Sequence, residues 1–296
     1  MKLEKFISEN KYGLLIKDKT FSELTTMKVG GKIKLLYYPS NIDCLKEVLF
    51  FLNKKKRDFF IIGNGSNLVA SEKKYKTLVI SGKHLIKSVD FFEDYFVASA
   101  FMDLRVLIAK LLEKQISTLT NLAGIPATVG GAVVMNSSAF NLAISDNLLW
   151  VKYLEDGIMK TKNKDEIYFS YRDSEFKNTN IVLVEVAFKT ICDQETVFNY
   201  KNILEKRRNK HPLNYPNCGS IFKNSKDYIA YEVIRKINMV DVAIGGAKFS
   251  EKHSNFIVNF NNAKANDIYK LIKIAKQKAL KYENIDLKEE VILLNF

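Results

Sequence analysis

The sequence predicts an α+β protein with two lobes. Apolar strands and amphipathic helices follow one another without a regular βαβ alternation, which argues against a doubly wound sheet. After the charged stretch 196–210 the predicted elements change from mainly strands to mainly turns and helices. A length of 296 residues with 47% hydrophobic residues is enough for more than one core. We therefore expect a first lobe over 1–195 and a smaller α+β lobe over 196–296.

The elements of the first lobe follow from periodicity and end signals. Residues 1–20 predict a short helix and a turn, and Asn41 caps a helix over 42–54 whose apolar residues have helical spacing. A second helix is predicted over 103–114. Strands are predicted at the apolar runs 33–38, 59–62, 77–80, 84–89, 95–100, 148–154 and 181–188.

The second lobe begins after one charged helix over 196–210, which joins the two lobes. Turns dominate 212–225. The helices expected beyond them are 228–238 and the amphipathic 266–282, and the strands are 254–260 and 291–294.

The composition excludes several classes of function. Only six of the 46 basic residues are arginine, and the lysines are scattered, so the charge of +13 indicates solvated faces and no nucleic-acid partner. No run of about 20 apolar residues predicts a membrane span, and the N-terminus lacks a signal core. Cys44, Cys192 and Cys218 have neither disulfide nor zinc spacing. We expect a cytoplasmic protein without a metal site.

The first glycine-rich segment follows the apolar run 59–62. Glycine lets backbone N–H groups approach an anion closely, and short polar side chains add donors, so this segment predicts a pyrophosphate cradle. An ordinary turn is the alternative, because Asn-Gly is common in tight turns. The candidate cofactor-binding residues here are Gly63, Asn64, Gly65, Ser66, Asn67 and Leu68.

The second glycine-rich segment is uncharged and flanked by apolar residues. It predicts a buried loop around a flat, largely neutral part of a ligand, and a packed turn between two core strands is an equally good alternative. The candidate cofactor-binding residues here are Gly124, Ile125, Thr128, Gly130, Gly131, Ala132 and Asn136.

Together with the segment 218–224, these patterns resemble the UDP-N-acetylenolpyruvoylglucosamine reductase family, a bacterial flavoenzyme family of peptidoglycan precursor synthesis. The matching segments occur in the family's order and are 25–31, 63–69, 123–136, 169–176, 218–224, 244–247, 252–259 and 287–291. The separation of 48 residues from Arg172 to Ser220 resembles the shorter class of the family, which lacks an inserted loop whose tyrosine covers the substrate.

The resemblance implies an FAD-binding lobe of the vanillyl-alcohol-oxidase/PCMH type over 1–195, with two subdomains and an N-terminal segment, and a substrate lobe over 196–296. It implies noncovalent FAD, NADPH as co-substrate and a UDP-sugar as substrate. The activity would be that of UDP-N-acetylmuramate dehydrogenase: the enolpyruvyl group is reduced to a lactyl ether. We expect a monomer, with no membrane or nucleic-acid partner.

The chemistry of this reaction requires a stabilised enediolate and a proton for its α carbon. The resemblance makes Arg172 a carboxylate clamp, although pairing with Asp173 is the alternative. Glu290, kept protonated, would hydrogen-bond the developing charge. Ser220, projected by a turn, would deliver the proton, with Cys218 as the rival donor. The candidate substrate-binding residues are Tyr171, Lys223, Asn224 and His253.

Two other functions remain open from the sequence. One is an FAD-dependent oxidase or dehydrogenase of the same fold that acts on a small alcohol or hydroxy acid. The other is a lysine-rich protein that binds nucleic acid or sugar nucleotides without turnover. A yellow protein would exclude the second of these, because noncovalent FAD is coloured.

Overall fold

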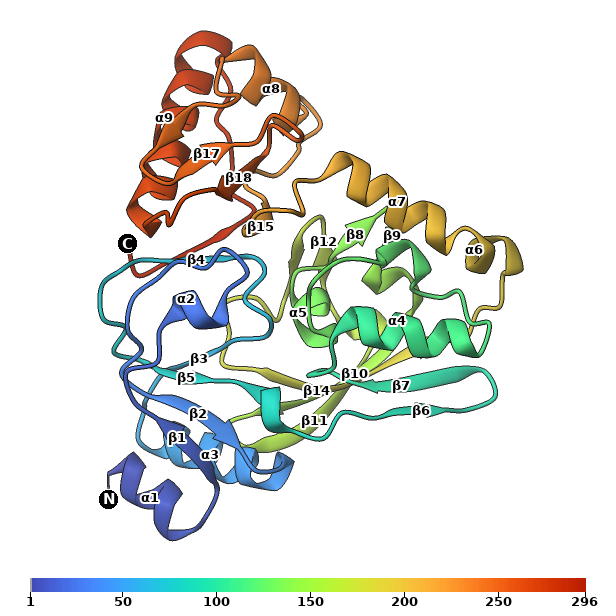
Figure 1. Cartoon of the computed structure of the whole chain (residues 1–296). Coiled ribbons are helices and arrows are strands. Elements are labelled where there is room, and N and C mark those ends of the chain that lie inside the picture. Colours follow the sequence, from blue (N-terminus) through green and yellow to red (C-terminus); the bar gives the residue numbers. More distant parts are fainter. Residues whose placement is uncertain (1) are drawn as a thin grey trace. The chain divides into compact units, whose positions relative to one another are not determined.

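The structure is a computed structural model that describes residues 2–296, and the chain forms two compact units (Figure 1). Unit 1 comprises residues 2–17, 34–64 and 76–204. Unit 2 comprises Asp18–Ile33, Gly65–Tyr75 and Glu205–Phe296. Each unit has its own hydrophobic core, and the predicted division into functional lobes at residue 195 stays a prediction.

The first sheet of unit 1 combines one antiparallel and two parallel pairings. In sheet order its strands are β1 (Gly13–Ile16), β2 (Leu36–Pro39), β5 (Leu78–Ile80) and β3 (Phe59–Ile61). Helix α3 (Ile42–Lys54) buries its apolar face here, and its N-cap Asn41 accepts a hydrogen bond from the Cys44 N–H at 2.8 Å. Helix α1 (Leu3–Glu9) joins the same core.

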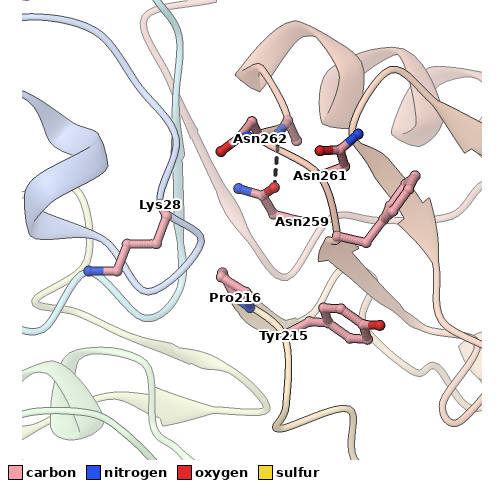
Figure 2. Close-up of a pocket in the computed structure, with 8 residues that line it drawn as sticks. Lys28, Tyr215, Pro216, Asn259, Asn261 and Asn262 are labelled. Carbon is pink, nitrogen blue, oxygen red and sulfur yellow. Dashed lines mark hydrogen bonds between the residues drawn. The ribbon is translucent and has the colours of Figure 1, made fainter.

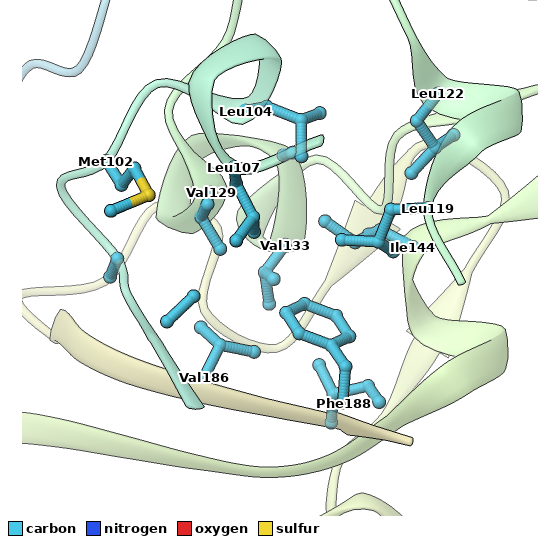
Figure 3. Close-up of a cluster of buried hydrophobic side chains, with 14 of the residues drawn as sticks. Met102, Leu104, Leu107, Leu119, Leu122, Val129, Val133, Ile144, Val186 and Phe188 are labelled. Atoms are coloured by element: carbon cyan, nitrogen blue, oxygen red, sulfur yellow. The ribbon is translucent and has the colours of Figure 1, made fainter. Parts of the chain in front are cut away.

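The second sheet of unit 1 is antiparallel throughout. In sheet order its strands are β11 (Ile158–Asn163), β10 (Leu148–Glu155), β14 (Val182–Lys189), β7 (Tyr95–Ser99) and β6 (Val89–Phe91). Helices α4 (Leu104–Glu113) and α5 (Val129–Val134) supply Leu107 and Val133 to the core over β14, as Figure 3 shows. Val129 and Ala132 of the second glycine-rich segment belong to this core.

Small elements complete unit 1. They are the 3₁₀ helices η1 (Gly82–His84), η2 (Thr120–Leu122), η3 (Ile144–Asn147) and η4 (Lys164–Glu166), the hairpins β8 (Ser138–Ala139) with β9 (Leu142–Ala143) and β12 (Phe169–Ser170) with β13 (Asp173–Ser174), and helix α6 (Gln194–Phe198). Helix α7 (Tyr200–Lys210) begins in unit 1 and ends in unit 2.

Unit 2 is built on a four-stranded antiparallel sheet. In sheet order its strands are β15 (Asn217–Ser220), β18 (Phe256–Asn259), β17 (Ala247–Phe249) and β16 (Ala243–Ile244). Helix α9 (Ala265–Glu283) packs on β16 and β17, and α8 (Ala230–Lys236) lies beside α9 (Figure 1). The remaining elements are helix α2 (Phe21–Leu24) and the parallel pair β4 (Leu68–Ala70) and β19 (Ile292–Leu294).

The α+β class is confirmed, and so are most long elements. Predicted strand 84–89 is wrong: η1 occupies its start, and the strand begins only at Val89. Leu85 is buried and Ile86 is 91% exposed, an alternation that resembles a strand although these residues pair with no neighbouring strand in the described chain. The single helix predicted over 196–210 is wrong as well, because Asn199 interrupts it between α6 and α7.

Several strands begin or end elsewhere than predicted. The strand expected over 33–38 is β2, which starts at Leu36, and Ile33 forms only an isolated bridge with Tyr75. Strand β15 lies in the stretch 212–225, where only turns were predicted. The other strands that were not predicted are β1, β4, β8, β9, β11, β12, β13, β16 and β17. Among residues 2–296, every helix is too short or too polar to cross a bilayer.

Candidate active site

The first glycine-rich segment leaves its backbone donors open. Within the described chain, none of the five N–H groups from Gly63 to Asn67 donates a hydrogen bond to a protein acceptor. Gly65 has φ +59°, a value that favours glycine. Five consecutive open donors are the property that an anion cradle requires. Gly63 and Asn64 belong to unit 1, whereas the segment from Gly65 to Leu68 belongs to unit 2.

Unit 1 brings the two glycine-rich segments together. A Cβ atom on Gly63 would lie 2.6 Å from Oγ1 of Thr128, so no larger residue fits there without a shift. The Asn64 side-chain amide donates to Oδ2 of Asp103 at 2.8 Å and to the carbonyl of Pro126 at 3.2 Å. The sequence-predicted residues Gly63, Asn64 and Thr128 are therefore neighbours in space.

The second segment runs from a loop over 124–128 into the short helix α5, so the expected loop covers only its first part. Thr128 caps α5 by accepting the Gly131 N–H at 3.1 Å. The Gly130 N–H donates to the Ala100 carbonyl at 2.7 Å, and the Ala132 N–H to the Thr128 carbonyl at 2.9 Å. These donors are used within the protein. Two of the predicted cofactor-binding residues of this segment, Gly124 and Thr128, have backbone N–H groups that donate to no acceptor in the described chain.

Asn136 follows α5 and holds a buried acceptor. It is 8% exposed, has φ +40°, and donates its amide to the Ser170 carbonyl at 2.8 Å. Its Oδ1 atom is buried without a partner in the described chain. An unsatisfied buried oxygen of this kind is costly unless a ligand supplies a donor. Ile125, the remaining predicted residue of this segment, packs against the core of unit 1.

Arg172 lies in the two-residue turn between β12 and β13. Its φ of +58° is in the left-handed region, an unusual conformation for arginine that is often found at functional sites. Its Nη1 donates to Oγ of Ser138 at 2.9 Å, and the guanidinium lies over the Tyr171 ring at 5.4 Å from the centroid. The neighbouring Asp173 forms an ion pair with Lys177 at 3.7 Å. The turn thus holds the guanidinium in one place.

Ser220 lies at the end of a bulged strand. The pairing of β15 with β18 shifts register between Asn217 and Ser220, which is a β-bulge, and bulges commonly re-aim side chains near active sites. Gly219 has φ +78° at this bulge, and its N–H donates to Oδ1 of Asn217 at 3.1 Å. The Ser220 hydroxyl is half-buried and has no hydrogen-bond partner among residues 2–296.

Glu290 is held beside this strand within unit 2. Its N–H donates to the Ile221 carbonyl at 2.8 Å, and its carbonyl accepts the Asn67 amide at 3.0 Å. Glu290 lies two residues before the start of β19. The adjacent Glu289 forms an ion pair with Lys276 at 2.7 Å. Unit 2 therefore places Glu290 next to the Ser220 strand and engages Glu289 elsewhere.

Cys218 is not a suitable proton donor. It is 2% exposed and belongs to the core of unit 2. Burial raises the pKa of its thiol to about 12. The thiol is therefore buried and weakly acidic, which leaves Ser220 as the better candidate.

The predicted substrate-binding residues have different surroundings. Oδ1 of Asn224 accepts the Ala230 N–H at 2.9 Å and so caps α8, which leaves its amide N–H groups for a ligand. Lys223 is tied through its backbone N–H to the Lys288 carbonyl at 2.8 Å. Tyr171 is 49% exposed beside Arg172.

His253 belongs to an aromatic cluster in unit 2. Its ring lies 4.7 Å from Phe256 and 5.4 Å from His211, measured between centroids. Burial lowers the pKa of His253, and burial followed by the charge of Arg207 lowers the pKa of His211 to about 4. Both imidazoles are therefore neutral near pH 7 and do not serve as cations there.

A pocket in unit 2 was missed by the sequence analysis. Figure 2 shows Lys28 on one side, the loop around Asn259 and Asn262 on another, and Tyr215 with Pro216 below them. The cavity volume is about 610 Å³. The segment 25–31 was singled out only for its resemblance, and no residue within it was given a role. In residues 2–296 no group of three or more His, Cys, Asp or Glu side chains could hold a metal ion.

Comparison with known proteins first defines a class. Residues 33–159 match the family described as "FAD binding domain", and residues 211–294 match "UDP-N-acetylenolpyruvoylglucosamine reductase, C-terminal domain". The chain is thus a two-part flavoprotein oxidoreductase, and the FAD-binding lobe type that the resemblance implied is confirmed.

The whole chain also matches curated proteins. A UDP-N-acetylenolpyruvoylglucosamine reductase from Chloroherpeton thalassium is 33% identical over 286 residues, which cover 94% of this chain and 92% of that protein. A reductase of the same name from Aquifex aeolicus is 32% identical over 95% of both chains. The chain belongs to the UDP-N-acetylenolpyruvoylglucosamine reductase family.

A solved structure shows the same fold. The crystal structure of a UDP-N-acetylenolpyruvylglucosamine reductase from Thermus caldophilus has a TM-score of 0.80 to this chain at 24% identity, and the match covers 95% of this chain and 98% of that one. At this identity the likeness supports the fold alone.

Proposed function

We propose that this chain reduces UDP-N-acetylenolpyruvoylglucosamine to UDP-N-acetylmuramate with electrons from NADPH, as the UDP-N-acetylmuramate dehydrogenase of peptidoglycan precursor synthesis. The observation that carries the proposal is the relationship to a curated reductase over 94% of the chain. Both parts of the protein, the FAD-binding domain and the reductase C-terminal domain, match in the expected order.

The residues present fit noncovalent FAD. The open N–H groups from Gly63 to Asn67 suit its pyrophosphate, and the unpaired Oδ1 of Asn136 suits a donor on the ligand. Gly63 packed against Thr128 leaves no space for a side chain, so the backbone itself forms this wall. Bound FAD would supply hydride transfer from NADPH to the enolpyruvyl group. The other predicted cofactor-binding residues are Leu68, Gly124, Ile125, Gly130, Gly131 and Ala132.

Hydride addition to the terminal carbon of the enolpyruvyl group moves negative charge onto its carboxylate. Arg172 binds this carboxylate in our proposal, because a planar guanidinium matches carboxylate geometry and its turn limits its movement. Glu290 donates a hydrogen bond to the enediolate that forms. Donors fixed before the reaction stabilise developing charge without reorganisation.

Ser220 donates its hydroxyl proton to the α carbon of the enediolate and completes the reduction. The open hydroxyl and the bulge that orients it support this role. A serine hydroxyl is a weak acid, but the enediolate carbon is a strong base, so transfer is feasible at hydrogen-bond distance. Tyr171, Lys223, Asn224 and His253 are proposed to bind the UDP-sugar.

The wider setting of the enzyme is also a proposal. We infer a cytoplasmic monomer that has no membrane partner. We also infer that it has no nucleic-acid partner, because lysines scattered over solvated faces make no arginine-rich recognition surface. We also infer that 1–195 binds FAD and 196–296 binds the UDP-sugar.

Anaerobic turnover tests the proposed function. The purified protein should be yellow, should release FAD on heating, and should convert NADPH and the enolpyruvyl sugar nucleotide in equal amounts to NADP⁺ and UDP-N-acetylmuramate. A yellow protein that consumes oxygen with a small alcohol, and does not reduce the enolpyruvyl sugar, would instead be an oxidase of the same fold.

A further inference from the structure

We propose that the pocket around Lys28 binds the phosphorylated ribose of a nucleotide, an inference that rests on the proposed function. The Lys28 pocket, as we call it, is lined by Lys28, Tyr215, Pro216, Asn259, Phe260, Asn261, Asn262 and Ala263, all within unit 2. None of the residues assigned above to FAD or to catalysis lines it.

The walls of the Lys28 pocket are joined by buried hydrogen bonds. The Asn259 side chain is 8% exposed; it donates to the Met27 carbonyl at 3.2 Å and accepts the Ala263 N–H at 2.8 Å. The Thr26 hydroxyl donates to the Asn217 carbonyl at 2.7 Å, which ties the same loop to β15. The pocket is thus built before any ligand arrives, and a preformed site avoids the entropy loss of ordering its walls.

The chemistry of the lining suits a sugar phosphate. It contributes one ammonium group, three carboxamides and a phenol, and no carboxylate is present among the lining residues. Lys28 forms no ion pair with any described residue. An ammonium group binds phosphate as a point charge, and carboxamides both donate to and accept from ribose hydroxyls. A phosphorylated ribose presents both kinds of group.

The backbone at Lys28 adopts the left-handed conformation, which several other non-glycine residues of the described chain share. Lys28 has φ +60°, in the left-handed region, where a non-glycine residue is strained by roughly 1–2 kcal/mol. Strain of this kind persists where the surrounding structure enforces it, and it is concentrated at binding sites. Figure 2 shows Lys28 across the pocket from the asparagine loop, with its side chain extending away from that loop.

One edge of the Lys28 pocket lies just before the strand that carries Ser220. Pro216 lines the pocket just before β15, and Ser220 ends β15. Four residues at about 3.3 Å each place the two at most roughly 13 Å apart, because the bulge at Gly219 shortens the strand. An extended nucleotide whose reacting end is at Ser220 could therefore reach the pocket with its ribose phosphate. Two sources have this chemistry: the 2′-phosphorylated adenosine of NADPH and the uridine diphosphate of the substrate.

Calorimetric titration of the purified protein with NADP⁺, NAD⁺ and UDP tests the proposal and distinguishes the sources. The variants are Lys28→Met and Lys28→Gly; the glycine also relieves the backbone strain, so it guards against misfolding. Lys264→Met is the matched control, because Lys264 is exposed on the same loop and does not line the pocket.

We expect both Lys28 variants to raise one dissociation constant about fivefold to tenfold, the range for losing a partly exposed charged contact. Weaker NADP⁺ binding with unchanged NAD⁺ binding would identify the 2′-phosphate, and weaker UDP binding the diphosphate. Changes below twofold for all three nucleotides, or an equal loss in Lys264→Met, would overturn the proposal. Calorimetry measures nucleotide binding without the need for flavin. A colourless protein would contradict the proposed function, and the titrations would still test the Lys28 pocket.

Discussion

Replacing Asn255 should test whether the backbone that follows Ser220 must be held in place for catalysis. Its side chain is 3% exposed, and its amide makes two hydrogen bonds to one residue: Oδ1 accepts the Phe222 N–H at 3.0 Å, and Nδ2 donates to the Phe222 carbonyl at 2.8 Å. Its own carbonyl accepts the Ile221 N–H at 2.8 Å. Asn255 therefore fixes the two residues that follow Ser220.

Replacement by alanine leaves the buried N–H and C=O groups of Phe222 without partners. Each unsatisfied buried group costs about 1–3 kcal/mol, so Asn255→Ala should lower the free energy of unfolding by about 2–5 kcal/mol. Urea denaturation followed by fluorescence measures this loss. Asn266→Ala is the control, because Asn266 is exposed on α9 and should change stability by less than about 0.5 kcal/mol.

The same variant should slow the step that uses Ser220. Stopped-flow experiments on the folded fraction of Asn255→Ala measure the two half-reactions separately. NADPH should reduce its flavin at nearly the wild-type rate, and the enolpyruvyl sugar should reoxidise the flavin slowly. A stability loss below about 0.5 kcal/mol, or equal slowing of both steps, would refute the argument that Asn255 positions Ser220.

Three further predictions follow from the structure. Gly63→Ala should purify with much less FAD, seen in the ratio of flavin to protein absorbance, because its Cβ would lie 2.6 Å from Oγ1 of Thr128; a fully yellow variant would contradict this. The folded-state pKa of His211 is about 4, below its ordinary 6.5, so the unfolded chain binds more protons and the free energy of unfolding should fall as pH drops from about 6.5 to 4. Denaturation at several pH values should show a shallower fall for His211→Phe. An unchanged slope would argue against a lowered pKa at His211. Thiol reagents at pH 8 should label the exposed Cys192 quickly and the buried Cys218 only after unfolding, as peptide mass mapping would show; early labelling of Cys218 would restore it as a proton-donor candidate.

Local signals in the sequence were sufficient to predict many of the longer helices and strands. Asn41 and the apolar spacing after it predicted α3 with correct ends, because an N-cap and one helical face are both local features. The sequence predicted a turn at Gly219, and the structure instead has a β-bulge in β15 at which Gly219 adopts the left-handed conformation. The catalytic candidates Arg172, Ser220 and Glu290 came from the family resemblance, and their roles stay predictions.

Non-local contacts explain what could not be predicted. The helix α5 replaces the later part of an expected loop because the Val129 and Gly130 N–H groups find their acceptors at Met102 and Ala100, almost 30 positions earlier in the chain. The Lys28 pocket likewise assembles the loop of Lys28 with residues near 215 and 260. Neither arrangement leaves a periodic pattern within one segment.

Single-turnover kinetics of Ser220→Ala under anaerobic conditions tests the central claim most directly. The account predicts that NADPH reduces the flavin of this variant at nearly the wild-type rate, whereas reoxidation by the enolpyruvyl sugar slows by about 10²–10⁴-fold, the usual contribution of a positioned acid. Reoxidation at the wild-type rate, or the same loss in both half-reactions, would contradict the role of Ser220 as the proton donor.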